Sequence, residues 1–362
     1  MKNKHYLLCI GIRPDIIRFS LIIKELEKYC NLTIVHSNQH YAPYLNELIF
    51  EQTQVRIPDI NLNIGSENTV EKTMIEFNKV LQKLKNKIDG VIVLGDNNSS
   101  LGFSFAAYKN LVPLLHIEGG MRSRNNLMQE ERNRKLIDQM ADLHFVYTEE
   151  NKYNLLQTGI EYKKIFVVGN PLLDVLKYYK EFAEKSNILK KLNLKRKEFL
   201  LATCHRGENV DSSEVLIDIL SGFSMVYQEY HLPIIFILMP RTEKRMKEFG
   251  LEFPKGIIPI EPLGFIDFLK LEKECLVLMT DSGSCEEEGY FLRIPTLVIR
   301  DQTERFELIQ EGISLLSGTS EWEIFNSAKC LMNPNHFVWK DNIYAGNIAE
   351  KITKILLGNW RK

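Results

Sequence analysis

Short apolar runs recur along the chain, and each ends in polar or small residues. The runs do not alternate with polar positions, which is typical of parallel strands that are covered on both faces. Segments with helical spacing separate most of them, such as residues 14–29. We expect strands within residues 6–14, 32–40, 90–98, 112–120, 143–150, 164–171, 199–209, 232–241, 256–264, 275–283 and 295–301.

This alternation of strands and helices predicts a doubly wound α/β fold. A chain of 362 residues is long for one core, so we expect two such domains that face each other across a cleft. The predicted domains are residues 1–170 and 171–345, because the charged segment 180–198 has no strand character. The last stretch, residues 346–360, has the apolar face of a terminal helix.

The composition is that of an ordinary globular protein, with 44% hydrophobic and 26% charged residues. Its 46 basic and 47 acidic residues give a net charge of −1, which favours neither nucleic acid nor an anionic membrane as a partner. An anionic small molecule needs only a local group of arginines. No apolar run approaches the length of a membrane span.

Six cysteines are spread along the chain, and none forms a C-x-x-C pair. Cys9, Cys275 and Cys285 lie in or beside apolar runs, which favours reduced thiols. The apolar stretch near the N-terminus is too short for a signal peptide, and Arg13 and Asp15 interrupt it. We therefore predict a cytoplasmic location.

The segment 276–288, LVLMTDSGSCEEE, places three glutamates directly after a strand and a turn of small residues. Ser284 and Glu287 have the spacing of a capping box, so the glutamates can simply begin a helix. A turn of this composition before a helix also binds phosphate through backbone N–H groups. The segment by itself does not decide between a helix start and a ligand site.

Polar residues stand at the carboxyl ends of the predicted strands, where open parallel sheets bind their ligands. The set mixes acids, imidazoles and arginines, so it can supply both acid/base groups and anion clamps. Its members are Arg13, His36, His40, Asp96, Glu118, His205, Arg206, Arg241, Ser282 and Arg300.

Asp96 and Glu118 end consecutive strands, and two acids so placed are better evidence of a site than one, which often only caps a helix. His205 and Arg206 can carry a proton beside a bound phosphate, and an ordinary loop explains them equally well. The helix expected at residues 129–139 carries opposite charges four residues apart, which surface salt bridges explain. These pairs are Glu130–Arg134, Glu131–Lys135 and Arg134–Asp138.

Nine motifs together carry a resemblance to a known family. In order they are GIRPDIIR, LGDNNS, HIEGGMRS, QEERNRKLID, GNPLLDVL, CHRGEN, PLGFIDF, TDSGSCEEE and RDQTERFE. Over nearly its whole length the chain resembles the non-hydrolysing UDP-N-acetylglucosamine 2-epimerases. The first motif and residues 240–245 (PRTEKR) are similar to the branch that acts on UDP-2-acetamido-2,6-dideoxy sugars.

The resemblance implies two Rossmann-like domains with the active site in the cleft between them, as in GT-B glycosyltransferases. It also implies that the C-terminal helix, within residues 346–362, packs back on the first domain. A homodimer is the family expectation.

The resemblance further implies which residues bind the substrate. The Ser-Gly turn would bind the diphosphate, and Glu288 would bind the uridine ribose, so that Glu286 and Glu287 need only begin the helix. Phe268 would lie against the uracil. The residues implied for UDP-sugar binding are Arg13, Arg18, Arg206, Phe268, Ser282, Gly283, Ser284, Glu288 and Arg305.

The implied chemistry is inversion at C2 of the sugar. The C2 proton is removed while UDP leaves C1, and UDP then adds back to the 2-acetamidoglycal as a proton reaches the opposite face. This reaction requires no redox cofactor and no metal. The residues at the family's acid/base positions are Asp96, Glu118, Glu130 and His205, and the face on which each acts stays open.

The sequence departs from the family pattern at several points. Arg18 replaces the usual lysine of the first motif, and Met239-Pro240 replaces a His-Pro pair that contacts an activating second UDP-sugar. We therefore expect no activation of this kind. Three other functions stay open: a hydrolysing 2-epimerase, a GT-B glycosyltransferase and a catalytically inactive sugar-nucleotide binder. The substituents of the sugar at C4, C5 and C6 are not predicted, because pocket shape selects them.

Overall fold

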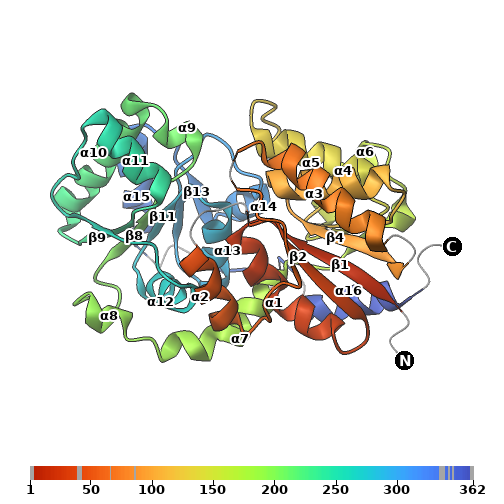
Figure 1. Ribbon diagram of the computed structural model, residues 1–362. Helices are drawn as coiled ribbons and strands as arrows, with labels where there is room; N and C mark the ends of the chain where they lie inside the picture. The colour runs from red at the N-terminus through yellow and green to blue at the C-terminus, as the bar shows by residue number, and fades with distance from the viewer. Residues whose placement is uncertain are drawn as a thin grey trace. The chain divides into compact units, whose positions relative to one another are not determined.

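The computed structural model describes residues 4–38, 43–65, 67–84, 87–333, 339–340, 343–344 and 346–358, without the side chains of residues 43–46. The chain forms two compact units. Unit 1 is Met1–Lys177 with Asn342–Lys362, and unit 2 is Tyr178–Asp341. The helix α7 (Pro171–Glu184) crosses the boundary between them (Figure 1).

Unit 1 is built on a seven-stranded sheet in which every described strand pair is parallel. The strand order is β3-β2-β1-β4-β5-β6-β7, so the direction of winding reverses between β1 and β4. This reversal is the point at which doubly wound sheets bind ligands. The strands are β1 (His5–Ile10), β2 (Asn31–His36), β3 (Ile60–Asn61), β4 (Gly90–Leu94), β5 (Leu114–Ile117), β6 (Leu143–Val146) and β7 (Ile165–Val167).

Helices cover both faces of this sheet. Those of unit 1 are α1 (Arg13–Leu26), α2 (Pro43–Thr53), α3 (Thr69–Leu84), α4 (Asn98–Lys109), α5 (Gln129–Met140), α6 (Glu149–Gln157) and α16 (Ile348–Leu357). Figure 1 shows α3, α4 and α5 in one layer, and α1 contacts α16. In that first layer Phe77 and Phe103 pack edge to face with ring centroids 4.9 Å apart. Buried aromatic pairs of this geometry stabilise a core beyond the area that they bury.

The C-terminal helix α16 belongs to unit 1, and hydrogen bonds fasten both of its ends. The Asp174 carboxylate accepts a hydrogen bond from the backbone N–H of Ile348 at 2.6 Å. The Tyr6 hydroxyl donates to the Leu356 carbonyl at 2.9 Å. A carboxylate at a helix N-terminus satisfies unpaired backbone donors and favours the helix dipole.

Unit 2 has a six-stranded parallel sheet in the order β10-β9-β8-β11-β12-β13. Its strands are β8 (Leu200–Thr203), β9 (Ile234–Ile237), β10 (Ile257–Ile260), β11 (Leu278–Thr280), β12 (Thr296–Val298) and β13 (Ser314–Leu316). Its helices are α8 (Ile188–Lys191), α9 (Gly207–Val210), α10 (Ser213–Tyr230), α11 (Pro240–Phe249), α12 (Phe265–Glu274), α13 (Gly283–Leu292), α14 (Phe306–Gln310) and α15 (Glu321–Leu331). One apolar cluster lies under α10 and α15, and a second lies under α8, α12 and α13.

The structure confirms the predicted α/β class with two Rossmann-like sheets, and each predicted apolar run contains a strand. No apolar run predicted β3 and β13, each of which is a short strand at one edge of its sheet. An edge strand is covered less completely and needs no long apolar run. Among the described residues, no helix has both the length and the apolar character to cross a membrane. All six cysteines are free thiols.

Candidate active site

In unit 1, the ends of β1, β4 and β5 meet through close backbone approaches. A Cβ atom on Gly11 would lie 2.3 Å from the Asn97 side-chain oxygen. Gly95, in the left-handed region with φ of +68°, lies under the Glu118 carboxylate, which would be 3.3 Å from a Cβ atom there. Only small residues allow these approaches, so the glycines bring the acids after β4 and β5 together.

Glu118 is held in an unusual backbone conformation by a buried ion pair. Its φ is +76°, which costs about 1 kcal/mol or more for a residue with a Cβ atom. Arg18 Nη1 lies 2.5 Å from Glu118 Oε2, and both side chains are buried. The Tyr147 hydroxyl donates to the same oxygen at 3.4 Å. Strain of this kind is typical of functional sites.

Asp96 is paired with Arg134 of α5, and this contact corrects the surface interpretation of that helix. Arg134 is only 2% exposed and also donates to Glu131 at 2.7 Å. Glu131 is buried as well and accepts a hydrogen bond from the Ser123 backbone N–H at 2.9 Å. Of the predicted pairs, only Glu131–Lys135 forms, with 3.2 Å between charged atoms. The inner face of α5 therefore holds Asp96 in place.

Glu130 is on the same helix and differs from its neighbour Glu131. Its side chain is half-buried and makes no hydrogen bond or ion pair to any residue that the structure describes. A carboxylate of this kind can take part in proton transfer, because no internal partner holds it.

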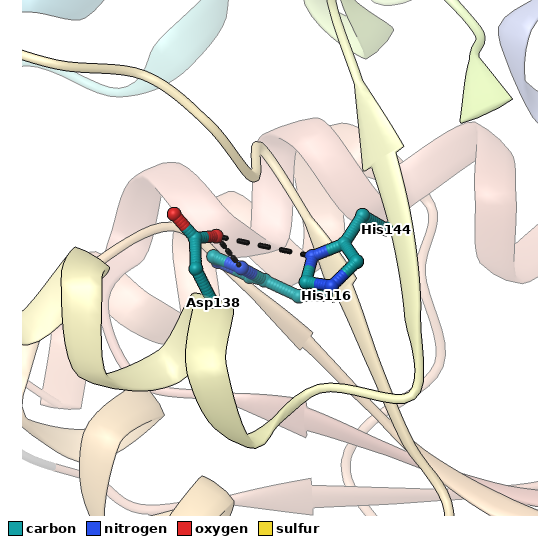
Figure 2. Close-up of side chains that lie close together, drawn as sticks. All are labelled: His116, Asp138 and His144. Carbon is teal, nitrogen blue, oxygen red and sulfur yellow. Dashed lines mark hydrogen bonds and ion pairs between the residues drawn. The ribbon is translucent and has the colours of Figure 1, made fainter. Parts of the chain in front are cut away.

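Behind the strand ends of unit 1, His116, Asp138 and His144 form a buried cluster (Figure 2). His116 Nδ1 is 2.9 Å from Asp138 Oδ1, and His116 Nε2 is 2.9 Å from the Gly95 carbonyl. Arg122 donates to the second oxygen of Asp138 at 2.7 Å. Hydrogen bonds to His116, followed by the charges of His116 and Arg122, lower the pKa of Asp138 to about 2 despite its burial.

The cluster also has the donor types of a metal site, with three ligand atoms within 4.8 Å of one another. However, Asp138 already bonds to His116 and to the Arg122 guanidinium, and a second cation there would be repelled. Neither ring nitrogen of His144 reaches a hydrogen-bond partner among the described residues. Burial lowers the pKa of His144 to about 4. The contacts fit a network that fixes the segment carrying Glu118.

Arg13 stands at the first position of α1, just beyond β1. It is half-buried and forms no ion pair with a described side chain, and burial lowers its pKa. The turn before it is fixed by Asp15, which accepts hydrogen bonds from the backbone N–H groups of Gly11 at 2.8 Å and Ile12 at 3.0 Å. Burial raises the pKa of Asp15 to about 7, against the effect of these two donors. Arg13 is therefore placed to contact an anion.

In unit 2, Asp281 organises the strand ends, a role that the sequence analysis missed. Its buried carboxylate accepts hydrogen bonds from the backbone N–H groups of His205 and Arg206, both at 2.8 Å. The His205 ring is partly exposed, with Nδ1 3.3 Å from Asp281 Oδ1. Because Asp281 follows an apolar strand directly, the strand-end rule could have found it.

The turn after Asp281 leads into α13, and here the predicted capping box is wrong. The helix begins at Gly283 with Ser282 as its N-cap, two residues earlier than a capping box at Ser284 requires. Glu287 is buried and accepts a hydrogen bond from Arg305 Nε at 2.9 Å. Glu287 therefore does more than begin a helix, because it also holds the Arg305 side chain.

Arg305 lies directly over the start of α13. A Cβ atom on Gly283 would be 2.2 Å from Arg305 Nη1, so only glycine permits this contact. Arg206 Nε donates to the Asp281 carbonyl at 2.8 Å, and its guanidinium lies 4.0 Å from Glu304. A helix N-terminus with two arginines beside it is an anion-binding arrangement.

The remaining predicted binding residues lie on or near the same helices. Ser284 and Glu288 are on α13, and Phe268 is half-buried on α12, which packs against α13. Of the other strand-end residues, His36 packs on Phe50, and Arg241 pairs with Asp211. His40 lies outside the described residues, as do residues 345 and 359–362 of the predicted terminal segment.

Comparison with known proteins shows which family the chain resembles. A sequence profile described as UDP-N-acetylglucosamine 2-epimerase matches residues 24–357. The chain is 39% identical over 360 residues to the UDP-N-acetylglucosamine 2-epimerase of Methanocaldococcus jannaschii, covering 96% of this chain and 98% of that protein. It is 34% identical to the UDP-2,3-diacetamido-2,3-dideoxy-D-glucuronate 2-epimerase of Pseudomonas aeruginosa, covering 89% and 91%.

The structure is also similar to a crystal structure of the Methanocaldococcus jannaschii UDP-GlcNAc 2-epimerase in complex with UDP-GlcNAc and UDP. The TM-score is 0.92 at 38% identity, covering 98% of this chain and 99% of that chain. The two parallel sheets therefore define an α/β protein of the GT-B-like class. Within that class, the chain belongs to the UDP-N-acetylglucosamine 2-epimerase family, a family of isomerases.

Proposed function

We propose that the chain is a non-hydrolysing 2-epimerase of a UDP-2-acetamido sugar. Its substrate would be UDP-N-acetylglucosamine, with UDP-N-acetylmannosamine as the product, or a close 6-deoxy or diacetamido analogue. The observation that carries the proposal is the anion site at the start of α13, where Arg305 packs against Gly283. The relatives named for UDP-GlcNAc and for a diacetamido sugar support this substrate class.

The proposed binding residues fall into two groups. In unit 2, the turn at Ser282, Gly283 and Ser284 binds the diphosphate together with Arg305 and Arg206, Glu288 binds the ribose diol, and Phe268 lies against the uracil. A carboxylate accepts two hydrogen bonds from a diol. In unit 1, Arg13 contacts UDP, and Arg18 orients Glu118 through their ion pair.

The proposed reaction begins when a base removes the C2 proton. The electron pair of that bond forms the C1=C2 double bond, and the C1–O bond breaks with its electrons leaving on UDP. UDP then attacks C1 of the 2-acetamidoglycal, while an acid gives a proton to the opposite face of C2. Asp96, Glu118, Glu130 and His205 supply these proton transfers, and the arginines and helix N-terminus stabilise the charge that develops on UDP.

Proton NMR of the purified protein with UDP-N-acetylglucosamine in D2O tests this proposal. We expect deuterium at C2 and a signal of UDP-N-acetylmannosamine. Free N-acetylmannosamine would show a hydrolysing enzyme instead. If UDP binds but C2 does not exchange, the assay is repeated with the 6-deoxy and diacetamido sugars, and failure with all of them would contradict the proposal in favour of a binding protein.

A further inference from the structure

Two carboxyl groups meet in the interior of unit 2, behind the anion site. Glu272 of α12 and Glu288 of α13 have carboxylate oxygens within 4.8 Å of each other, and the Cys285 sulfur lies within the same distance of both. Glu272 is fully buried, and Glu288 is 6% exposed. Two carboxylates so close in a low dielectric cannot both stay ionised at moderate cost.

The surroundings of Glu272 decide which carboxyl keeps the proton. Burial, and then the charge of Glu288, raise the pKa of Glu272 well above its ordinary value. Neither of its carboxylate oxygens accepts a hydrogen bond from a described N–H or O–H group. The nearby thiols are those of Cys275 and Cys285, whose pKa values burial raises, so both are neutral.

No cation in the described residues offsets a charge on Glu272. The ammonium of Lys270, on the same helix, pairs with Glu184 at 2.7 Å and with Glu274 at 2.9 Å. Arg196 also pairs with Glu274, at 2.6 Å. The charged side chains around α12 therefore bond to one another and leave Glu272 to face Glu288.

We propose that Glu272 is protonated and donates its hydrogen bond to the Glu288 carboxylate, which makes Glu272 a positioning residue for the nucleoside end of the substrate. This inference rests on the proposed function, in which Glu288 binds the ribose. This hydrogen bond fixes the orientation of the Glu288 carboxylate, which binds the ribose diol in the proposed function. It also joins α12, which carries Phe268, to α13, which carries the diphosphate turn.

A calorimetric titration with UDP tests the role in binding. As pH rises from a value below the folded-state pKa of Glu272 to a value above it, we expect the UDP affinity of the wild type to fall about tenfold or more, because Glu272 loses its proton. Glu272→Gln keeps an N–H donor that does not titrate, so its affinity should change less than about threefold over the same range. Glu272→Leu, which has no donor, should bind UDP at both pH values about tenfold more weakly than the wild type does at the lower pH. Glu261→Gln, an exposed change before α12, is the matched control and should follow the wild type.

Urea unfolding without UDP reports the protonation of Glu272 independently of ligand binding. The folded-state pKa of Glu272 is raised, so its contribution to stability is complete below the unfolded pKa and is lost as pH rises through the folded pKa. Glu272→Gln should therefore gain stability relative to the wild type as pH rises, and Glu261→Gln should not.

The two measurements separate the possible failures. If the wild type binds no UDP at any pH, the proposed function fails and the positioning role with it, while the urea data still report the proton. If Glu272→Gln retains the pH dependence of the wild type in UDP binding, the inference is overturned. It is also overturned if Mn²⁺ raises the melting temperature of the wild type and not of Glu272→Gln, because the pair would then be a cation site.

Discussion

Arg18 and Glu118 are a hundred positions apart in the sequence, yet their charged atoms lie 2.5 Å apart in the interior of unit 1. The pair joins α1 to the end of β5, where Glu118 holds its left-handed backbone conformation. Since Glu118 is also a proposed acid/base residue, we propose that the arginine that the chain has in place of the family's usual lysine orients this carboxylate for catalysis.

Removing Arg18 should destabilise the protein and abolish epimerisation. Arg18→Met leaves a buried carboxylate without its cation, which costs about 3–5 kcal/mol in the free energy of unfolding. The control is Arg56→Met, because Arg56 pairs with Glu27 at the same 2.5 Å and with Asp59 at 2.7 Å, and all three side chains are 34% to 41% exposed. That change should cost less than about 1 kcal/mol. Equal losses in the free energy of unfolding of the two variants would show that burial does not strengthen the contribution of the Arg18–Glu118 pair to stability.

Gly283→Ala should weaken both UDP binding and stability. The new methyl group would displace the Arg305 guanidinium, so we expect UDP affinity to fall about tenfold or more, since a hydrogen bond between charged groups contributes about 1.5–3 kcal/mol. The free energy of unfolding should fall as well, by about 1–3 kcal/mol, because the displaced guanidinium loses its hydrogen bond to the buried Glu287 carboxylate. Gly222→Ala in α10 should lower stability without lowering UDP affinity, because its methyl group would meet Ile324 in the core. Calorimetry and urea unfolding of both variants measure the contrast.

Asp281→Asn should weaken UDP binding through the loop that carries His205 and Arg206. The amide oxygen still accepts hydrogen bonds, but the charge that strengthens the two 2.8 Å contacts is gone. We expect a loss of about 1–3 kcal/mol in stability and a lower affinity for UDP. Unchanged UDP affinity in a calorimetric titration would mean that the loop is held without Asp281.

His144 should make the protein sensitive to mild acid. Burial lowers its pKa from 6.5 to about 4, so the unfolded chain binds a proton that the folded protein rejects, and stability falls as pH drops through this window. The full loss is about 3 kcal/mol for this one group. His144→Leu cannot bind this proton. The stability of the variant minus that of the wild type should therefore be larger near pH 4 than at neutral pH. Parallel stability curves with pH would contradict this assignment.

Local patterns predicted the strands well because a strand covered on both faces must be apolar along its length, as Val91 to Leu94 are in β4. The same reasoning failed for α5. Opposite charges four residues apart suggested surface pairs, whereas Arg134 reaches Asp96, which is 38 positions away in the sequence. The capping box failed likewise, since Arg305 pairs with Glu287 from a later segment. Local spacing carries no information about such partners.

The proposed mechanism requires that the C1–O bond breaks and forms again during turnover. UDP-N-acetylglucosamine labelled with ¹⁸O in the bridge between C1 and the β-phosphate tests it directly. If UDP leaves and returns, phosphorus NMR should show the label moving from the bridge to the non-bridging β-phosphate oxygens while C2 epimerises. Epimerisation with the label still in the bridge would contradict the elimination mechanism.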